Sequence, residues 1–176
     1  MRMYALRSIV AATLVVGICA STGAQERRAS PHEKATATVD GAKISVEYGR
    51  PYVKGRKIFG GLVPFGQVWR TGADEATILV TDQPLTIGSL AVPAGSYSLY
   101  TIPGEKEWTL IVNKQTGQWG TQYSEAQDLG RVTMKASKPD KAVEQFTITV
   151  ADTPAGGELQ FDWDQTRAVA PFVVKK

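Results

Sequence analysis

Apolar and polar residues alternate in short runs through most of the chain after residue 35. A period of two is typical of strands that bury one face and expose the other. Leu159, Phe161 and Trp163 place three large apolar groups on one face of such a run, and the residues that alternate with them are polar. The pattern therefore predicts antiparallel strands with one face in a core.

Turn residues separate these runs. Asp40-Gly41 is a hairpin signal, and Gly88-Ser89 marks another tight turn. Only residues 124–128 favour a turn of helix. The chain therefore predicts an all-β protein, an antiparallel β-sandwich of about nine or ten short strands. Alternation also puts Tyr97 and Tyr100 on opposite faces of one strand, one toward the core and one away from it.

One long segment, from Tyr48 to Thr77, breaks the alternation. It is rich in glycine, proline, aromatic residues and cations, and no acid lies between Glu47 and Asp74. Long irregular segments in compact domains are usually functional or disordered, and the apolar content of this one argues against disorder. We expect residues 49–75 to cap one end of the sandwich or cross one face, with their apolar side chains packed inward. The loop at 113–123 would form the opposite wall of a surface depression.

The first 24 residues have the pattern of a secretory signal peptide. Arg2 and Arg7 precede a 12-residue apolar run, which is short for a membrane span, and small residues follow up to Ala24. We predict cleavage after Ala24, with cleavage after Ala20 as the alternative, and export to the periplasm or the cell exterior. Cys19, the one cysteine, would leave with this segment, so we expect no disulfide and no thiol catalysis.

Removing 24 of the 176 residues, and with them two arginines, would leave 152 residues with 18 cations and 17 acids. We expect residues 25–34 to be a flexible leader and residues 35–176 to form a single β-sandwich domain, a size that buries a sufficient core. The near-zero net charge argues against nucleic acid as a partner. No second apolar span is present, so we expect no transmembrane span. The oligomeric state stays open.

Groups for metal or covalent chemistry are scarce. The sole histidine, His32, falls in the expected leader, and we interpret it as a solvent-exposed residue. With one histidine and no cysteine in the mature chain, we expect no metal site, no cofactor and no Ser-His-Asp triad. Gly55 and Gly60-Gly61 lie near lysines but do not match a nucleotide-binding fingerprint.

Asp74-Glu75 is the most suggestive pair of carboxylates. Either residue could act with Glu47 as a glycosidase-like pair, although no spacing argues for it. The favoured interpretation is that Asp74 or Glu75 pairs with Arg70 and staples the turn at Thr71-Gly72.

The cations between residues 50 and 70 form either a solvated loop face or an edge that binds anions. Trp119 lies in a Gly-rich loop, where a core tryptophan is less expected, so a stacking platform for sugars or peptides is one interpretation. The other is that such rings plug the open ends of the sandwich. The candidate ligand-binding residues are Arg50, Lys54, Arg56, Trp69, Arg70, Asp74, Glu75 and Trp119.

Three strings are distinctive: RPxVKGRxIFG at residues 50–60, VWRTGAxEAT at 68–77 and PAGxYxLYTIPG at 93–104. Through them the chain, from about Ser30 to Val174, resembles the secreted bacterial family catalogued as a domain of unknown function, number twenty-nine eleven. The resemblance implies an exported, single-domain, mostly-β protein. It brings no activity, cofactor or catalytic residue that can be transferred.

The sequence favours an exported, non-catalytic binding module of the cell envelope, for a glycan, a peptide or another anionic ligand. Such a module requires cations and aromatic residues on one face. The first alternative is an envelope hydrolase with a carboxylate pair, which requires a perturbed carboxylate in a cleft. The second is a structural or assembly protein that pairs through an exposed edge strand, which requires an apolar patch without a cleft.

Overall fold

The computed structural model describes residues 29–175, which form eleven strands and one short 3-10 helix. The helix, Glu125–Gln127, falls within the predicted turn of helix. The strands are β1 (His32–Val39), β2 (Ala42–Gly49), β3 (Thr77–Thr81), β4 (Leu85–Ile87), β5 (Leu90–Val92), β6 (Gly95–Ile102), β7 (Glu107–Asn113), β8 (Asp128–Ser137), β9 (Val143–Thr153), β10 (Gly156–Asp164) and β11 (Thr166–Val174).

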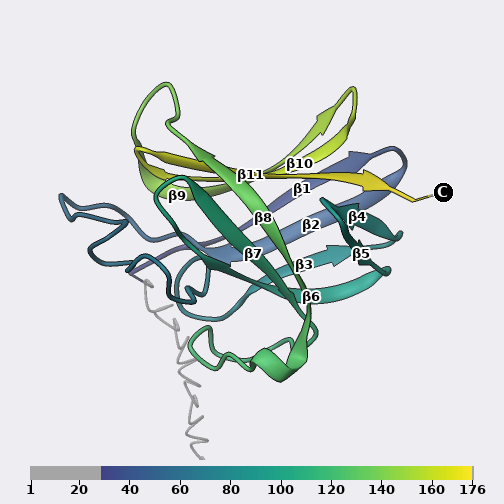
Figure 1. Cartoon of the computed structure of the whole chain (residues 1–176), viewed down its shortest axis with the longest axis horizontal. Helices are drawn as coiled ribbons and strands as arrows, with labels where there is room; N and C mark the ends of the chain where they lie inside the picture. The colour runs from purple at the N-terminus through teal and green to yellow at the C-terminus, as the bar shows by residue number, and fades with distance from the viewer. Residues whose placement is uncertain (1–28, 176) are drawn as a thin grey trace, which may run out of the picture.

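All strand pairs are antiparallel, and the strands form one sheet in the order β1-β2-β3-β6-β7-β8-β11-β10-β9. The sheet curls until its outer strands, β1 and β9, approach each other, although within residues 29–175 no ladder joins them (Figure 1). The all-β prediction is confirmed, but the strands make one nearly closed, barrel-like sheet instead of two clearly separate ones. Alternation shows that one face is buried, and it does not show whether the buried faces belong to one curled sheet or to two stacked sheets.

A tyrosine at the end of β2 bridges the seam to β9. The Tyr48 hydroxyl accepts a hydrogen bond from the Ile148 amide at 2.8 Å and donates one to the Ile148 carbonyl at 3.3 Å. Burial raises the pKa of the Tyr48 phenol, so the group stays protonated and keeps both bonds at physiological pH.

The local signals in the sequence match the structure. The β1–β2 turn has left-handed backbone at Asp40 (φ 48°) and Gly41 (φ 86°), as a two-residue hairpin requires. On β10, the side chains of Leu159, Phe161 and Trp163 are at most 1% exposed, so the predicted core face is confirmed.

Strand β6 is buried on both faces, which corrects the prediction that one of its tyrosines faces away from the core. Tyr97 packs into the main core, and Tyr100 lies on the other face in a small apolar cluster with Ile111. The connection at residues 114–127 covers this second face, where Gln118 Nε2 donates to the Tyr100 hydroxyl at 3.0 Å. A period of two gives the opposite faces correctly, but it cannot show that a loop covers the outer one.

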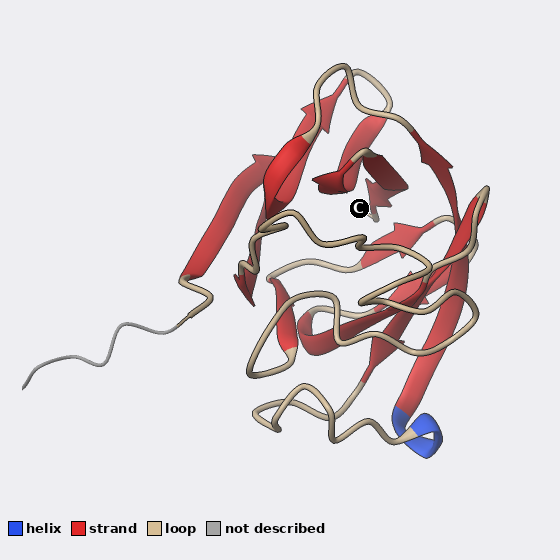
Figure 2. Cartoon of the chain, turned by 90° about the vertical axis from the view of Figure 1, so that its left-hand side faces the viewer, coloured by secondary structure: helices blue, strands red, loops and turns tan. Residues whose placement is uncertain are grey.

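Residues 50–76 cross one end of the curled sheet between β9 and β6, the end that Figure 2 turns toward the viewer. At one side Tyr52 forms a backbone bridge with Gln145 of β9. At the other side Trp69 and Thr101 of β6 exchange backbone hydrogen bonds at 2.7 and 3.0 Å. The segment is irregular, as predicted, and it is anchored at both sides of the end that it covers.

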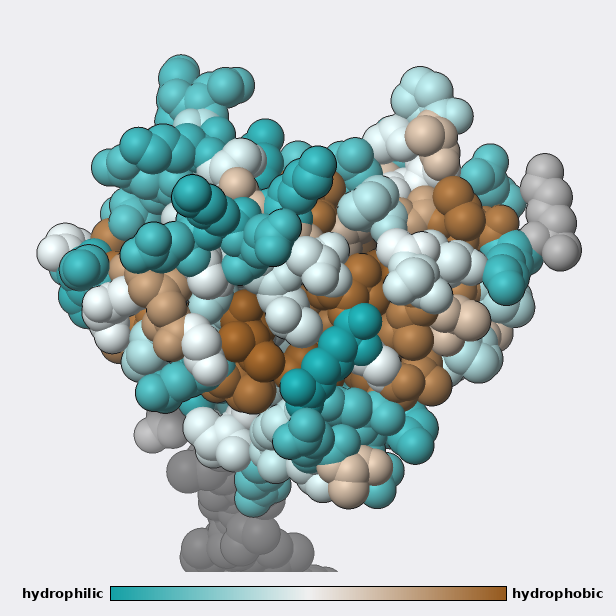
Figure 3. Space-filling model, viewed as in Figure 1, coloured by the Kyte–Doolittle hydropathy of each residue, from teal (hydrophilic) through white to brown (hydrophobic). Residues whose placement is uncertain are grey.

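The β4–β5 hairpin fills a gap in the sheet. Strand β11 pairs with β8 through Arg167–Val169 and with β4 through Phe172–Val174, so β4 takes the place of β8 where β8 and β11 diverge. Leu85, Ile87 and Val92 of the hairpin are buried. Figure 3 shows apolar residues gathered around this hairpin and β8 in the middle of the face.

Strand β1 begins at His32, inside the stretch 25–34 that we expected to be a flexible leader. Residues 32–34 pair with residues 47–49 of β2, so this part of the leader prediction is wrong. Backbone hydrogen bonds hold these polar residues in an outer strand, where no alternation of apolar side chains marks them. The predicted signal peptide, residues 1–24, lies outside the described residues. Within residues 29–175, no helix has the length and apolar character needed to cross a membrane.

Candidate functional site

A pocket of about 570 Å³ lies between the segment that crosses the end of the sheet and the connection from β7 to β8. This volume is within the usual range of small-molecule sites, about 300–1,000 Å³. Residues 51–74 form one wall and residues 120–123 contribute the opposite one. Its charged and larger apolar lining residues include Tyr52, Lys54, Arg56, Leu62, Val63, Val68, Trp69, Arg70, Asp74, Tyr100, Tyr123 and Trp163.

The floor of the pocket is the edge of the aromatic core. The Trp69 ring stacks on the Trp163 ring, and Phe59 and Phe146 pack edge-on or tilted against Trp69 at 6.0 and 5.1 Å. These rings plug the end of the sheet, as one of the two sequence interpretations predicted. Trp163 Nε1 is buried without a hydrogen-bond partner among the described residues.

Three cations line the pocket, and within residues 29–175 none of them forms an ion pair. Arg56 Nε donates to the Val53 carbonyl at 3.0 Å. Lys54 Nζ lies 5.8 Å from the centre of the Tyr52 ring, within the range of a cation–π contact. Among the described residues one acid lines the pocket against three cations, so this part of the lining carries a net positive charge.

Arg70 does not staple the turn after it through an ion pair, which corrects the favoured sequence interpretation. Its Nε donates to the Gly72 carbonyl at 3.3 Å, and the carboxylates of Asp74 and Glu75 lie beside His32 instead. On a regular strand, adjacent side chains point to opposite faces. The left-handed backbone at Asp74 (φ 64°) breaks that rule and lets both carboxylates reach one partner.

Buried hydroxyl groups hold this turn in place. Thr77 Oγ1 donates to the Thr71 carbonyl at 2.7 Å, and Thr71 Oγ1 lies 3.1 Å from Thr101 Oγ1. From the opposite wall, the Gly120 amide donates to the Asp74 carbonyl at 2.9 Å. The two walls of the pocket are therefore tied together by backbone contacts.

Arg50 lies outside the pocket lining and joins strands. Its Nε donates to the Phe146 carbonyl at 3.0 Å, and its Nη2 donates to Thr147 Oγ1 at 2.8 Å, both on β9. Its Nη1 pairs with Glu33 on β1. Arg50 is thus a clasp between the two outer strands of the sheet.

Trp119 adjoins the pocket without lining it. Its side chain is 47% exposed, which agrees with its place in a Gly-rich loop. Its backbone forms a bridge with Glu75, and its neighbours Gly120 and Thr121 line the pocket.

Tyr100 and Tyr123 also line the pocket, with ring centroids 4.9 Å apart. The Tyr123 hydroxyl donates to Asp128 Oδ2 at 2.8 Å and accepts from Arg131 Nη2 at 3.0 Å. Burial, together with the bond to Asp128, raises the pKa of Tyr123 to about 12, so this phenol is neutral at physiological pH. Sequence reasoning did not select these tyrosines, because their position depends on the course of the β7–β8 connection.

Two apolar residues at the pocket correct the expectation that this segment packs its apolar side chains inward. Leu62 is 50% exposed and Val68 is 40% exposed, and both line the pocket. The signal for this part of the site was the presence of apolar residues in a cationic segment rich in glycine and proline. The sequence does not show which of these apolar residues fill the core and which face a cavity.

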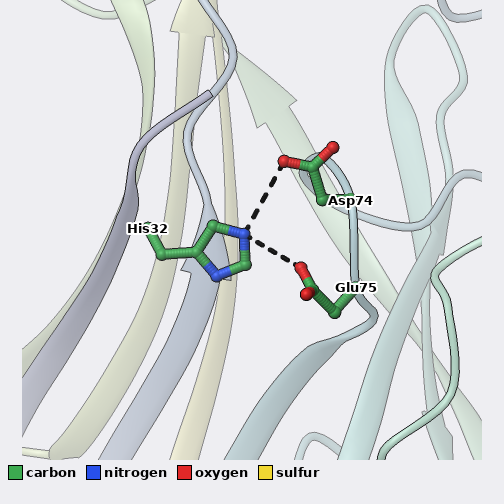
Figure 4. A group of neighbouring side chains, drawn as sticks. All are labelled: His32, Asp74 and Glu75. Atoms are coloured by element: carbon green, nitrogen blue, oxygen red, sulfur yellow. Dashed lines mark ion pairs between the residues drawn. The ribbon is translucent and has the colours of Figure 1, made fainter. Parts of the chain in front are cut away.

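A second cluster lies at the edge of the pocket, where His32 points between two carboxylates (Figure 4). His32 Nε2 lies 3.2 Å from Glu75 Oε2 and 3.8 Å from Asp74 Oδ2. The three side chains are 25–41% exposed. As a whole residue His32 is exposed, as predicted, but it does not belong to a flexible leader, because the pairing of β1 with β2 carries it to the turn at residues 72–75.

Comparison with known proteins agrees with the resemblance noted in the sequence. Searches of curated proteins and of solved structures give no match. Residues 30–172 match the family described as "Protein of unknown function (DUF2911)", which covers nearly all of the described fold. The chain therefore belongs to the DUF2911 family.

Proposed function

We propose that the chain is a non-catalytic binding protein of the cell envelope, and that its pocket binds a small ligand with an anionic group and a flat apolar or sugar-ring face. The observation that carries the proposal is the union of Lys54, Arg56 and Arg70 with aromatic rings in one pocket of about 570 Å³. Export rests on the signal-peptide pattern of residues 1–24.

The chemistry of the lining favours this class of ligand. An arginine guanidinium binds carboxylate or sulfate groups through two parallel hydrogen bonds, and the backbone carbonyls that hold Arg56 and Arg70 leave other N–H groups for such a contact. Trp69 and Tyr52 supply ring faces for stacking. The volume suits one or two sugar rings or a dipeptide, so a polymer would insert its end.

The hydrolase alternative has less support. A glycosidase needs two carboxyl groups about 5–10 Å apart across its cleft. Asp74 is the one acid among the described residues that line the pocket, and its carboxylate lies beside His32. The assembly alternative needs an exposed edge strand, whereas Tyr48 already joins β2 to β9 and Arg50 joins β1 to β9.

Binding of 8-anilinonaphthalene-1-sulfonate, an anionic aromatic probe, tests the proposal by isothermal titration calorimetry. We expect one saturable site and about a tenfold or greater loss of affinity in Arg56→Ala/Arg70→Ala, because each charge-assisted hydrogen bond contributes roughly 1.5–3 kcal/mol. The matched control is Lys138→Ala/Lys141→Ala, which removes two exposed cations outside the pocket lining. Equal affinity in the two double variants would contradict the proposal.

A small ligand panel identifies the natural class. We expect a uronic-acid disaccharide or an aromatic dipeptide with a free carboxylate to compete with the probe. The neutral disaccharide, in which the carboxyl group is reduced to an alcohol, and the amidated dipeptide should compete much less, because they lack the charge that the cations bind. If the neutral forms compete at the same concentration, the ligand does not need an anionic group, and that part of the proposal is wrong.

A further inference from the structure

We propose that His32, Asp74 and Glu75 form a binding site for one divalent first-row transition-metal ion, with Zn²⁺ as the probe. The imidazole nitrogen and one oxygen of each carboxylate all lie within 4.8 Å of one another. Figure 4 shows His32 pointing at both carboxylates from the opposite side of the gap. The inference goes beyond the proposed function and does not depend on what the pocket binds.

The spacing of the donor atoms fits such an ion. Zinc bonds to nitrogen and carboxylate oxygen are about 2.0–2.2 Å long, so two donors of a tetrahedral site lie about 3.3–3.5 Å apart. The separations from His32 Nε2 are 3.2 Å to Glu75 Oε2 and 3.8 Å to Asp74 Oδ2, on either side of that range. The Asp74 and Glu75 oxygens lie within 4.8 Å of each other, so the two carboxylates would have to draw together around the ion to complete three sides of a coordination shell.

The donor types select the class of metal. One imidazole and two carboxylates suit Zn²⁺, Mn²⁺ or Fe²⁺, whereas Ca²⁺ and Mg²⁺ prefer oxygen ligands alone. The three side chains are 25–41% exposed, so water or a ligand group can fill the remaining coordination positions. Since Asp74 also lines the pocket, a bound ion would add positive charge at its edge.

The backbone brings the three donors together without relying on loop mobility. His32 pairs with Gly49 across the β1–β2 ladder. A Cβ on Gly49 would lie 2.3 Å from the Ala73 carbonyl oxygen and 3.2 Å from His32 Nε2, so only glycine allows this approach of β2 to the turn. The Asp74 carbonyl is fixed by the Gly120 amide, and the backbone of the following residue forms a bridge to the opposite wall.

The same three side chains are also compatible with a purely structural role. A protonated His32 would form an ion pair with the two carboxylates and join β1 to the turn, with no metal bound. Both arrangements hold the three groups together, and only the first gives the protein a stoichiometric affinity for a metal. Direct measurement of metal binding separates them.

The experiment is a titration of the tag-free, EDTA-treated full chain with ZnCl2, followed by calorimetry and by NMR of the imidazole. His32 is the one histidine in the chain, so its ring gives a single set of signals. We expect one Zn²⁺ per chain with a dissociation constant on the order of micromolar, a shift of the His32 ring signals that saturates at one equivalent, and a higher melting temperature with zinc.

Variants test the ligand set. Asp74→Asn/Glu75→Gln should lower zinc affinity about tenfold or more, whereas the control Glu105→Gln/Asp152→Asn, which removes two exposed acids elsewhere, should not change it. Absence of stoichiometric binding to the wild type, or binding that leaves the His32 ring signals unchanged, overturns the proposal. These wild-type readouts decide the matter even if a variant fails to fold.

Discussion

The rings of Trp69 and Trp163 stack with their centroids 5.6 Å apart and their planes 15° from parallel. Trp69 comes from the segment that crosses the end of the sheet, and Trp163 comes from β10, so this contact joins the pocket floor to the core. Substitutions at the floor should therefore affect stability and binding together. Substitutions of the pocket cations should affect binding alone.

Trp69 at the pocket floor also belongs to the aromatic core. Trp69→Ala should lower the free energy of unfolding by about 3–5 kcal/mol, because the ring contacts with Phe59, Phe146 and Trp163 are lost and a cavity remains. Trp119→Ala, which removes a half-exposed ring of the same type, should change it by less than about 0.5 kcal/mol. Urea unfolding followed by far-UV circular dichroism measures both, and equal losses would show that Trp69 is not a core residue.

Two arginines should behave differently although both come from the cationic segment. Arg50→Ala should lower the free energy of unfolding by about 1.5–3 kcal/mol, because it removes charge-assisted bonds between β1 and β9. Arg70→Ala should cost less than about 1 kcal/mol, because its guanidinium forms no ion pair in the described part of the chain. Thermal and urea melts of the pair test this order, and a larger loss for Arg70→Ala would restore the staple interpretation.

Local chemistry made much of the fold predictable. The hairpin at Asp40-Gly41 and the core face of Leu159, Phe161 and Trp163 follow from turn residues and from a period of two, and both are present. The closure of the sheet was not predictable, because it depends on the accumulated twist of eleven strands and on contacts between β1 and β9. The hydrogen bond between Tyr48 of β2 and Ile148 of β9, on the same seam, joins residues one hundred positions apart in the sequence.

The sequence predicted the segment that forms one wall of the site better than it predicted the individual site residues. The unusual composition of residues 48–77 identified the wall that carries Lys54, Arg56 and Arg70. The composition did not distinguish these pocket cations from Arg50. Arg50 contacts β9 instead of lining the pocket, and that contact depends on the tertiary fold. His32 was not predicted as a site residue for a related reason. Its partners are about forty residues away in the sequence, and the pairing of β1 with β2 brings His32 to them.

Gly49 should tolerate no side chain. In Gly49→Ala the new Cβ would meet the Ala73 carbonyl oxygen at 2.3 Å, so the turn at residues 72–75 must move away from β2. We expect a loss of about 2–4 kcal/mol in stability. Gly55→Ala is the control: its Cβ would meet no atom within 4 Å, and only the left-handed backbone (φ 69°) opposes it, at about 1–2 kcal/mol.

Differential scanning calorimetry of the two glycine variants gives the comparison. A smaller shift in melting temperature for Gly49→Ala than for Gly55→Ala would mean that β2 and the turn do not approach each other as closely as described.

Tyr123 should make stability depend on alkaline pH. Its pKa is raised from 10.0 to about 12 in the folded chain, so the folded state holds this proton more tightly than the unfolded state. The stabilisation is fully present below pH 10 and is lost as the pH rises toward about 12. Spectrophotometric titration of the wild type minus Tyr123→Phe should show a phenol with a midpoint near pH 12, and urea melts between pH 9 and pH 12 should show a shallower decline in the variant. A difference titration centred at pH 10 would contradict the burial of this phenol together with its hydrogen bond to Asp128.

The most direct test of the binding account is an NMR titration of the ¹⁵N-labelled protein with 8-anilinonaphthalene-1-sulfonate, followed at the indole signals of the tryptophans. If the pocket is the ligand site, the Trp69 and Trp163 signals shift together and saturate with one affinity, and amide shifts concentrate at residues 52–74 and 118–123. If those signals stay in place while shifts appear around the β4–β5 hairpin, or if no signal saturates, the pocket is not a ligand site and the central claim is wrong.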